Sequence, residues 1–335
     1  MKYTGFPVHN STLAGPGLAQ RVLSKYNLPS PISCNFLRSG VNDTYIVKAG
    51  AATYFLRVYR YGWRTKGEIQ AELEMLIYLH QRRLPVSWPI ERKDGACLTP
   101  IAAPEGVRYA VLFTNAPGKG FDRNIKNSCA YGELAGKIHS CLDKAPDDGR
   151  RFQLDLPHLI DQPLHHIEPF LEHRRKDFDY LKKVGGELKL QIGELLPKTK
   201  PEYGNCHGDH HGGNLHRDNH GKMTLFDFDC YGYGWRAYDL AVFLWNSSVS
   251  DDWSAKAKSG RTRGWNAFLE GYSKTRTLGA HELKATNIFV PIRHIWLLGL
   301  HTQLADTSGR GWFDDSYFDF HIRFIKRWLE YRKIL

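Results

Sequence analysis

One segment in the second half of the chain constrains the fold more than any other. It reads His207-Gly-Asp209-His-His-Gly-Gly-Asn214, and two short segments expected to be strands, Asn214 to His216 and Met223 to Phe226, follow, separated by a polar turn that ends in glycine. This order predicts a β-hairpin that brings Asp227, directly after it, together with Asp209 and Asn214. Two carboxylates and an amide oxygen form a hard site, which suits Mg²⁺ and does not suit Zn²⁺.

The first third of the chain predicts a helix followed by a small antiparallel sheet. Its strands are short, rich in aromatic and β-branched residues, and separated by turn residues. A helix from about Gly67 to Arg82 follows, with an apolar stripe at 3.6 residues per turn that places Glu72 at its edge. The expected strands are Ser33 to Leu37, Asp43 to Lys48, Thr53 to Tyr59 and, after the helix, Tyr109 to Phe113.

Beyond Gly120 the periodicity becomes helical, apart from the hairpin. This change predicts a domain boundary near Asn115, which divides the chain into residues 1–114 and 115–335. Helical patterns cover Tyr131 to Leu142, Ile167 to Val184 and Leu188 to Leu196.

The composition indicates which classes of ligand and partner the protein is expected to bind. The formal charge of +11 favours anionic ligands such as nucleotides. The basic clusters lie in helical patterns and are interpreted as solvated faces, so no nucleic-acid partner is expected.

The six cysteines are scattered and do not have the spacing of a zinc site or a redox pair. The N-terminal residues lack the apolar core of a secretory signal and no membrane-length apolar run occurs, so a cytoplasmic protein is expected. Nothing in the sequence indicates an oligomeric state.

Three elements in order carry a family resemblance. The pattern His-x-Asp-x-x-x-x-Asn, a strand ending in an aspartate, and Tyr238-Asp239-Leu240-Ala241 together resemble the signature of the aminoglycoside phosphotransferase and choline kinase superfamily. The layout is most similar to its homoserine-kinase-like and stress-response-kinase-like branch. The resemblance implies an α+β, bilobal protein-kinase-like fold with a small antiparallel β N-lobe and a mainly helical C-lobe that contains a catalytic β-hairpin.

The resemblance also implies roles for the central segment. Asp209 is the expected catalytic residue, which accepts or orients the proton of an acceptor hydroxyl. Asn214 and Asp227 are expected to hold Mg²⁺. Asp229 is a further candidate for metal contact, because two residues along an extended segment it would point to the same side as Asp227.

Nucleotide contacts are expected from the first lobe. Arg57 matches the basic residue of the third strand that pairs with a helix glutamate, here Glu72. An arginine fork can bridge phosphates and a carboxylate, although protein kinases have lysine there. The glycine-rich loop of protein kinases is absent, and backbone amides near Ser39 and Gly40 are expected to contact the ATP phosphates instead.

Further residues are expected in supporting positions. Thr114 and Ala116 occupy the place of the kinase hinge, whose backbone would contact adenine. His207 is expected to fix the catalytic loop by packing and hydrogen bonding. Asp239 is expected to cap the next helix and to brace the same loop from behind.

The expected activity is ATP- and Mg²⁺-dependent transfer of a phosphate to a hydroxyl of a small molecule: an antibiotic, an amino alcohol or a homoserine-like metabolite. The alternatives are a stress-response-type Ser/Thr protein kinase, a catalytically silent nucleotide-binding scaffold and, from the many histidines, a zinc hydrolase. The positive charge disfavours polycationic aminoglycosides, although Asp251-Asp252 and Asp314-Asp315 offer local acid.

Overall fold

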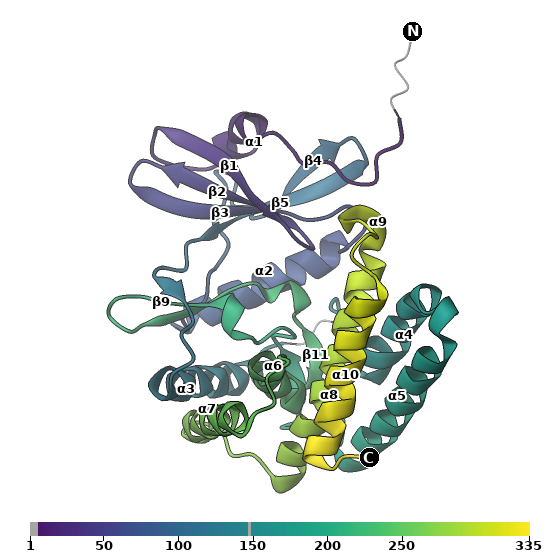
Figure 1. The fold of residues 1–335 in the computed structure, drawn as a ribbon. Coiled ribbons are helices and arrows are strands. Elements are labelled where there is room, and N and C mark those ends of the chain that lie inside the picture. Colours follow the sequence, from purple (N-terminus) through teal and green to yellow (C-terminus); the bar gives the residue numbers. More distant parts are fainter. Residues whose placement is uncertain (1–5, 147–148) are drawn as a thin grey trace. The chain divides into compact units, whose positions relative to one another are not determined.

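An antiparallel sheet forms the centre of the first structural unit in the computed structural model, which describes residues 6–146 and 149–335. Residues 1–5, where the N-terminal segment begins, lie outside the described residues. The strand order is β1-β2-β3-β5-β4 (Figure 1). The strands are β1 (Ile32–Ser39), β2 (Asp43–Ala49), β3 (Ala52–Val58), β4 (Thr99–Ala103) and β5 (Gly106–Thr114).

Strand β4 is the element of this sheet that the sequence analysis missed. It contains Pro100, which is unfavourable within a central strand because proline has no amide hydrogen. In the structure β4 pairs with β5 alone and forms the sheet edge, where proline is tolerated.

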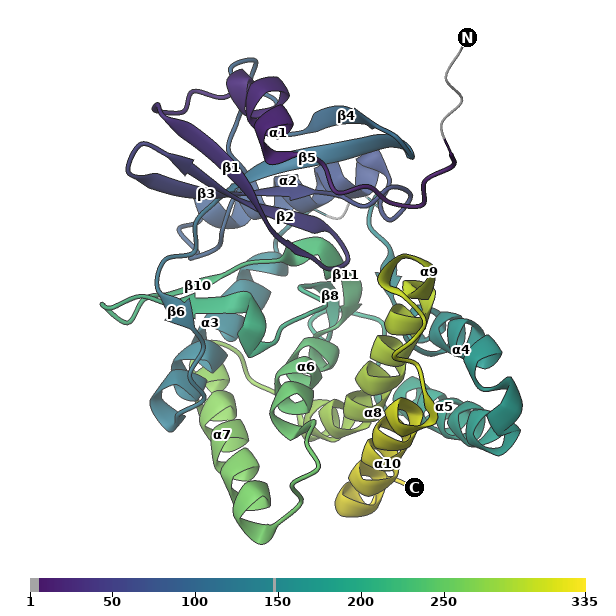
Figure 2. The same ribbon diagram turned by 45° about the horizontal axis from the view of Figure 1, so that its top comes forward.

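Helices cover both faces of the sheet, with α1 (Gly15–Arg21) on one side and α2 (Lys66–Gln81) on the other (Figures 1 and 2). Leu18 and Val22 join Tyr45, Val47 and Leu56 in a buried core under α1. Helix α2 starts at a capping box, in which the side chains of Thr65 and Glu68 each accept the backbone amide of the other residue. This start matches the predicted helix within one residue.

The first unit comprises the chain up to Pro117 together with Thr224–Phe226. Leu225 lies beside Val86 in a parallel bridge, in which the amide of Ser87 donates to the Leu225 carbonyl at 2.9 Å. The predicted boundary near Asn115 places residues 224–226 in the helical part instead, because a contact between such distant segments leaves no local pattern.

The second unit is mainly helical, and α8 packs against α4, α5, α6 and α10 (Figure 2). Its helices are α3 (Ile125–Leu142), α4 (Gln162–Ile167), α5 (Arg175–Leu195), α6 (Arg236–Ser248), α7 (Ala255–Ser273), α8 (Ala280–Gln303), α9 (Ala305–Ser308) and α10 (Asp315–Arg332). No helix in the described part of the chain is both long and apolar enough to cross a membrane.

Helix α5 corrects the prediction of separate helices at 167–184 and 188–196. The Gly185-Gly186 pair, which falls between the two predicted ranges, lies inside one continuous helix. A β-carbon at Gly185 would lie 2.9 Å from Ile160 Cγ2, so this glycine allows close packing. The packing outweighs the lower helix propensity of glycine.

Short strands frame the central motif of the second unit. Strand β8 (Tyr203–Cys206) ends directly before His207, and it pairs antiparallel with β11 (Gly232–Trp235), which leads into α6; β7 (Gln153–Leu154) lies on the other side of β11. β9 (Leu215–Arg217), which pairs with β6 (Lys119–Gly120), and β10 (Met223–Leu225) are the two predicted hairpin strands. Their turn is closed by a 3.0 Å hydrogen bond from the Asp218 amide to the Lys222 carbonyl.

Candidate active site

The loop after β8 is held from behind by the buried carboxylate of Asp239. Its Oδ2 accepts the amide of His207 and its Oδ1 the amide of Gly208, each at 2.7 Å. Asp239 lies in the first turn of α6 but does not cap it, because the N-cap residue is Trp235 and no side chain makes the cap bond. The capping part of the prediction is therefore wrong, whereas the contact with the loop is direct.

His139 of α3 completes this support. Its Nε2 lies 3.1 Å from Asp239 Oδ2 and its Nδ1 lies 2.8 Å from the hydroxyl of Tyr272. Burial lowers the pKa of His139 to about 4, so the imidazole is neutral near pH 7. Burial works to raise the pKa of the Asp239 carboxyl, but the hydrogen bond from His139 and nearby histidines outweigh burial and hold that pKa below its usual range.

Asp209 lies at the turn of the loop with its side chain 21% exposed. Its Oδ1 accepts from Arg293 Nη2 at 2.5 Å, and its Oδ2 accepts from Asn214 Nδ2 at 3.2 Å. Burial works to raise the pKa of Asp209, but the charge of Arg293 and the neighbouring His211 outweigh it and hold the pKa well below its usual range. The carboxylate is therefore ionised over the physiological pH range.

His207 and Gly208 shape the loop itself. The Nδ1 of His207 accepts the amide of Asp209 at 3.1 Å, and its ring packs on Phe228 with centroids 4.2 Å apart. Gly208 has φ +79°, and a β-carbon there would lie 2.0 Å from the Cys230 carbonyl oxygen. Only glycine fits this position without moving the backbone.

The structure brings Asn214 against Asp209 in an orientation that suits a metal ligand. The carboxylate can only accept, so the amide must present its NH₂ group, which also donates to the Asp209 carbonyl at 3.0 Å. The amide oxygen is then the atom that Asn214 offers to a cation. Oxygen donors of this kind fit Mg²⁺.

Asp227 has a left-handed backbone, with φ 65° and ψ 63°. Non-glycine residues adopt this region at a cost of roughly 1–2 kcal/mol, and such strain clusters at functional sites. Phe228–Cys230 then form a 3₁₀ turn. The premise for Asp229 is therefore wrong, because the segment is not extended and Asp229 is not placed on the side of Asp227 by strand alternation.

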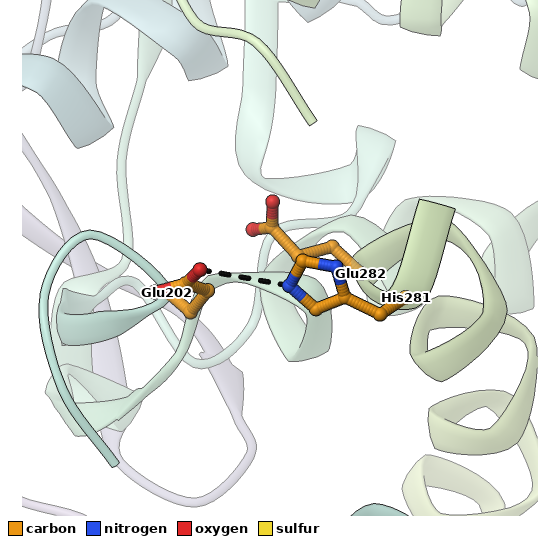
Figure 3. A group of neighbouring side chains, drawn as sticks. All are labelled: Glu202, His281 and Glu282. Atoms are coloured by element: carbon orange, nitrogen blue, oxygen red, sulfur yellow. Dashed lines mark ion pairs between the residues drawn. The ribbon is translucent and has the colours of Figure 1, made fainter. Parts of the chain in front are cut away.

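Asp209, Asp227 and Asp229 do not form a close cluster of metal ligands. Within residues 6–146 and 149–335, the group of three His, Cys, Asp or Glu side chains whose ligand atoms all lie within 4.8 Å is Glu202, His281 and Glu282 (Figure 3). Glu282 caps α8 by accepting the Gly279 amide at 2.9 Å. Among the described residues, the histidines of the central motif are not part of such a group.

In the first unit, Arg57 and Glu72 form an ion pair of 2.9 Å between Nη1 and Oε1. Glu72 is fully buried, and its Oε2 accepts the Tyr59 hydroxyl at 2.9 Å. The guanidinium of Arg57 also lies 5.0 Å from the ring centroid of Phe113. These contacts fix the direction of the Arg57 side chain.

The loop after β1 is held by hydrogen bonds within the loop, to Asp43 and from Arg60. The amide of Gly40 donates to the Asn42 carbonyl at 3.1 Å, and the Ser39 hydroxyl donates to Asp43 Oδ1 at 2.7 Å. Arg60 donates to the carbonyls of Gly40 and Val41, at 2.7 and 2.8 Å. The Gly40 amide must therefore exchange a hydrogen bond before it can contact a phosphate.

Thr114 also differs from its expected role. Its amide donates to the Trp88 carbonyl at 3.0 Å, and its carbonyl accepts from the Ser87 hydroxyl at 2.6 Å. The Thr114 amide is thus already paired with the segment between α2 and β4 and is not available to adenine. The adjoining Ala116 is buried, and its contact with adenine stays a prediction.

Sequence reasoning missed Arg293, His139 and Arg60. Each is one polar residue among many in a helix or loop, and Arg293 is 84 positions from Asp209. Only His139 had a local signal, because it lies next to Ile138 and Leu142 on the buried side of α3. A buried histidine requires a hydrogen-bond partner, and the sequence did not identify that partner.

A five-stranded antiparallel sheet in one unit, and a mainly helical unit with a braced His-Gly-Asp loop, define a phosphotransferase of the protein-kinase-like class. The chain belongs to the Phosphotransferase enzyme family, whose profile matches residues 33–278. A protein of unassigned function from Synechocystis sp. is 35% identical over 93% of this chain and 85% of its own length. Amicoumacin kinase of Bacillus subtilis is 26% identical over 82% of each chain.

Solved structures confirm the fold. An amicoumacin kinase in complex with AMP-PNP, Ca²⁺ and its ligand Ami superimposes with a TM-score of 0.77 at 23% identity, covering 94% of this chain and 93% of that one. A microcompartment-associated aminopropanol kinase also gives 0.77, at 21% identity and 95% and 98% coverage. Together with the family match and the similarity to Bacillus subtilis amicoumacin kinase, these structures confirm the resemblance to the aminoglycoside phosphotransferase and choline kinase superfamily.

Proposed function

We propose that the protein transfers the γ-phosphate of ATP to a hydroxyl of a small molecule, with Asp209 as the catalytic residue. One observation carries this proposal: the Asp209 carboxylate is partly exposed while a buried arginine, an amide and a braced loop hold it in place. A carboxylate held in one orientation can align an acceptor hydroxyl, and positioning is the main task in phosphoryl transfer.

In the proposed step the acceptor oxygen forms a bond to the γ-phosphorus and the bond between that phosphorus and the β,γ-bridging oxygen breaks, releasing ADP. The hydroxyl proton passes to Asp209. Because the pKa of Asp209 is held low, this carboxylate is a weak base. It would orient the hydroxyl throughout and take the proton late, once the new oxygen–phosphorus bond makes that proton acidic.

Mg²⁺ and ATP are the proposed cofactors. When bound, Mg²⁺ neutralises charge on the phosphates, and Asn214 and Asp227 would hold it; Asp229 stays a candidate on its own. Arg57, fixed by Glu72, would contact the phosphates. The solved amicoumacin kinase was crystallised with AMP-PNP and Ca²⁺, which supports a nucleotide and a divalent cation for this chain.

A small acceptor is favoured over a protein by the segment from Asp227 to Asp239. Protein kinases have a long activation segment after the metal-binding aspartate. Here a 3₁₀ turn, the strand β11 and the start of α6 occupy that stretch completely. No extended loop remains there to align a peptide.

Asp251, Asp314 and Asp315, which could supply local acid, are already partnered, which argues against a polycationic acceptor. Asp251 lies 3.4 Å from Arg323 Nη2, and Asp315 accepts from His173 at 2.9 Å. Asp314 caps α10 through the amide of Tyr317. A neutral or singly charged acceptor, such as an amino alcohol, fits this balance, and one similar structure is that of an aminopropanol kinase. A cytoplasmic location belongs to the same proposal.

A screen of hydroxyl-bearing metabolites and antibiotics for acceptor-dependent ADP release tests the function. We expect at least one amino alcohol or singly charged compound to respond, and Asp209→Asn to lose about 10²–10⁴-fold in kcat with nucleotide affinity retained. Asp252→Asn is the matched control, because this acid lies on an exposed loop. A flat response to every acceptor, with Mg-ATP binding demonstrated, would instead support a nucleotide-binding scaffold.

A further inference from the structure

The guanidinium of Arg293, on α8, occupies a position that neither the family profile nor the central motif assigns. Its Nη2 lies 2.5 Å from Asp209 Oδ1, and its side chain is 3% exposed. We propose that Arg293 is a positioning residue for phosphoryl transfer, which sets the orientation of the Asp209 carboxylate. This inference rests on the proposed function, since it concerns the same carboxylate.

Two tryptophans form a slot for the guanidinium. Its carbon lies 5.0 Å from the ring centroid of Trp245, on α6, and 4.3 Å from that of Trp296, on α8. Both indoles are buried. A planar cation held against two aromatic faces has little freedom to turn, so the ring pair fixes the direction in which the fork points.

Hydrogen bonds to histidines hold the two tryptophans that form the slot. Trp245 Nε1 donates to His294 Nδ1 at 2.9 Å, and Trp296 Nε1 donates to His158 Nε2 at 3.3 Å. A histidine nitrogen that accepts carries no proton, so His294 is neutral with its proton on Nε2. That Nε2 lies 2.9 Å from Nδ1 of His321, to which it donates.

The loop backbone is held mainly by Asp239, and Arg293 adds a longer contact of 3.5 Å from its Nη1 to the Gly208 carbonyl. Asp239 accepts the amides of His207 and Gly208 and fixes the backbone, whereas Arg293 binds the carboxylate. The 2.5 Å contact between Nη2 and Asp209 Oδ1, together with the slot that holds the guanidinium, points to a task at the Asp209 side chain.

Arg293→Met and Arg293→Lys test the proposal in the full-length protein. Methionine fills the slot without charge, while lysine keeps the charge but lacks a planar fork. Arg236→Met is the matched control, because Arg236 is equally buried and pairs with Asp143 at 2.9 Å. ADP release is measured with and without the best acceptor from the screen, and rates are divided by the nucleotide-binding fraction.

We expect Arg293→Met to lower kcat about 10²-fold while the KM values for ATP and acceptor stay within about threefold, as misplacement of a catalytic group does. Lysine should restore part of kcat, and Arg236→Met should lose stability with kcat per folded molecule unchanged. Combining Arg293→Met with Asp209→Asn should cost no more than Asp209→Asn alone. Unchanged kcat in Arg293→Met overturns the proposal.

A crystal structure of Arg293→Met separates this inference from the proposed function. We expect the Asp209 carboxylate to turn away from its present orientation. A carboxylate that keeps the same rotamer overturns the positioning role, whatever the acceptor is. A wild-type enzyme that transfers phosphate to no acceptor and not to water contradicts the proposed function, while the rotamer result still decides the role of Arg293.

Discussion

Asp239 Oδ1 accepts the backbone amide of Gly208 at 2.7 Å, so a carboxylate on a helix fixes the loop that carries Asp209, the proposed catalytic residue. The same carboxylate accepts the amide of His207 through its other oxygen. An ionised, fully buried acceptor makes stronger hydrogen bonds than a neutral one. The position of Asp209 therefore depends on the charge of Asp239 as well as on local backbone preference.

Asp239→Asn is expected to reduce both stability and activity. The amide NH₂ would face one of the two loop amides, so a buried donor would lose its acceptor, at a cost of about 1–3 kcal/mol. Urea unfolding measures this loss, and kcat should fall about 10²-fold because the loop shifts. Asp306→Asn is the control, since Asp306 forms an exposed pair with Arg310. A variant with wild-type kcat would show that the brace is dispensable.

Gly208→Ala is expected to disrupt the loop more severely than its size suggests. The added β-carbon would lie 2.0 Å from the Cys230 carbonyl, at a left-handed φ of +79°. We predict a kcat at least about 10²-fold lower. Gly186→Ala is the matched control, because nothing lies within 4 Å of its added β-carbon in α5 and alanine should stabilise that helix by about 0.5–1 kcal/mol. Equal kcat in the two variants would contradict the packing argument.

Arg57→Met is expected to weaken ATP binding. With the guanidinium removed, the phosphates lose a charged contact and Glu72 is left buried without its partner at 2.9 Å. We predict a KM for ATP raised about tenfold, the effect of about 1.4 kcal/mol, and a smaller thermal shift on addition of Mg-ATP. Lys48→Met, which changes an exposed residue of the neighbouring strand β2, should leave both unchanged. A normal KM for ATP in Arg57→Met would show that Arg57 and Glu72 form only a structural ion pair.

As the pH is lowered, the free energy of unfolding is expected to begin decreasing at a higher pH than protonation of carboxylates would explain. Burial lowers the pKa of His321 to about 3 and that of His294 well below its usual value. An unfolded histidine has a pKa near 6.5, so between that value and the folded pKa the unfolded chain binds more protons. The stabilisation is complete above about pH 6.5 and declines as pH falls, by up to about 1.4 kcal/mol per pH unit for each histidine.

Urea midpoints at pH 7.5, 6 and 5, roughly spanning the titration range of an unfolded histidine, measure this decline. His321→Gln should flatten the slope, since it removes one such group and keeps a side chain that can hydrogen-bond. His220→Gln, in the exposed hairpin turn, should keep the wild-type slope. Identical slopes in all three proteins would rule out a contribution from His321.

Sequence reasoning succeeded where the constraint was local. The spacing of Asp209, Asn214 and Asp227 gave the hairpin, and the edge position of Glu72 on its helix gave the partner of Arg57. It failed where tertiary contacts decide. Pro100 is tolerated because β4 is an edge strand, and Gly185 is helical because Ile160 packs against it. Arg293 reaches Asp209 only through helix packing, which leaves no periodic signal.

The contact between Arg293 and Asp209 also bears on how the protein is made. Synthesis runs from the N-terminus, so the loop with Asp209 leaves the ribosome 84 residues before the arginine that orients it. The sheet and α2 can fold while α8 is still being translated. A nascent or truncated chain that ends before α8 would carry every residue of the central motif and still have a misaligned carboxylate, so the last helices determine when the chain becomes an enzyme.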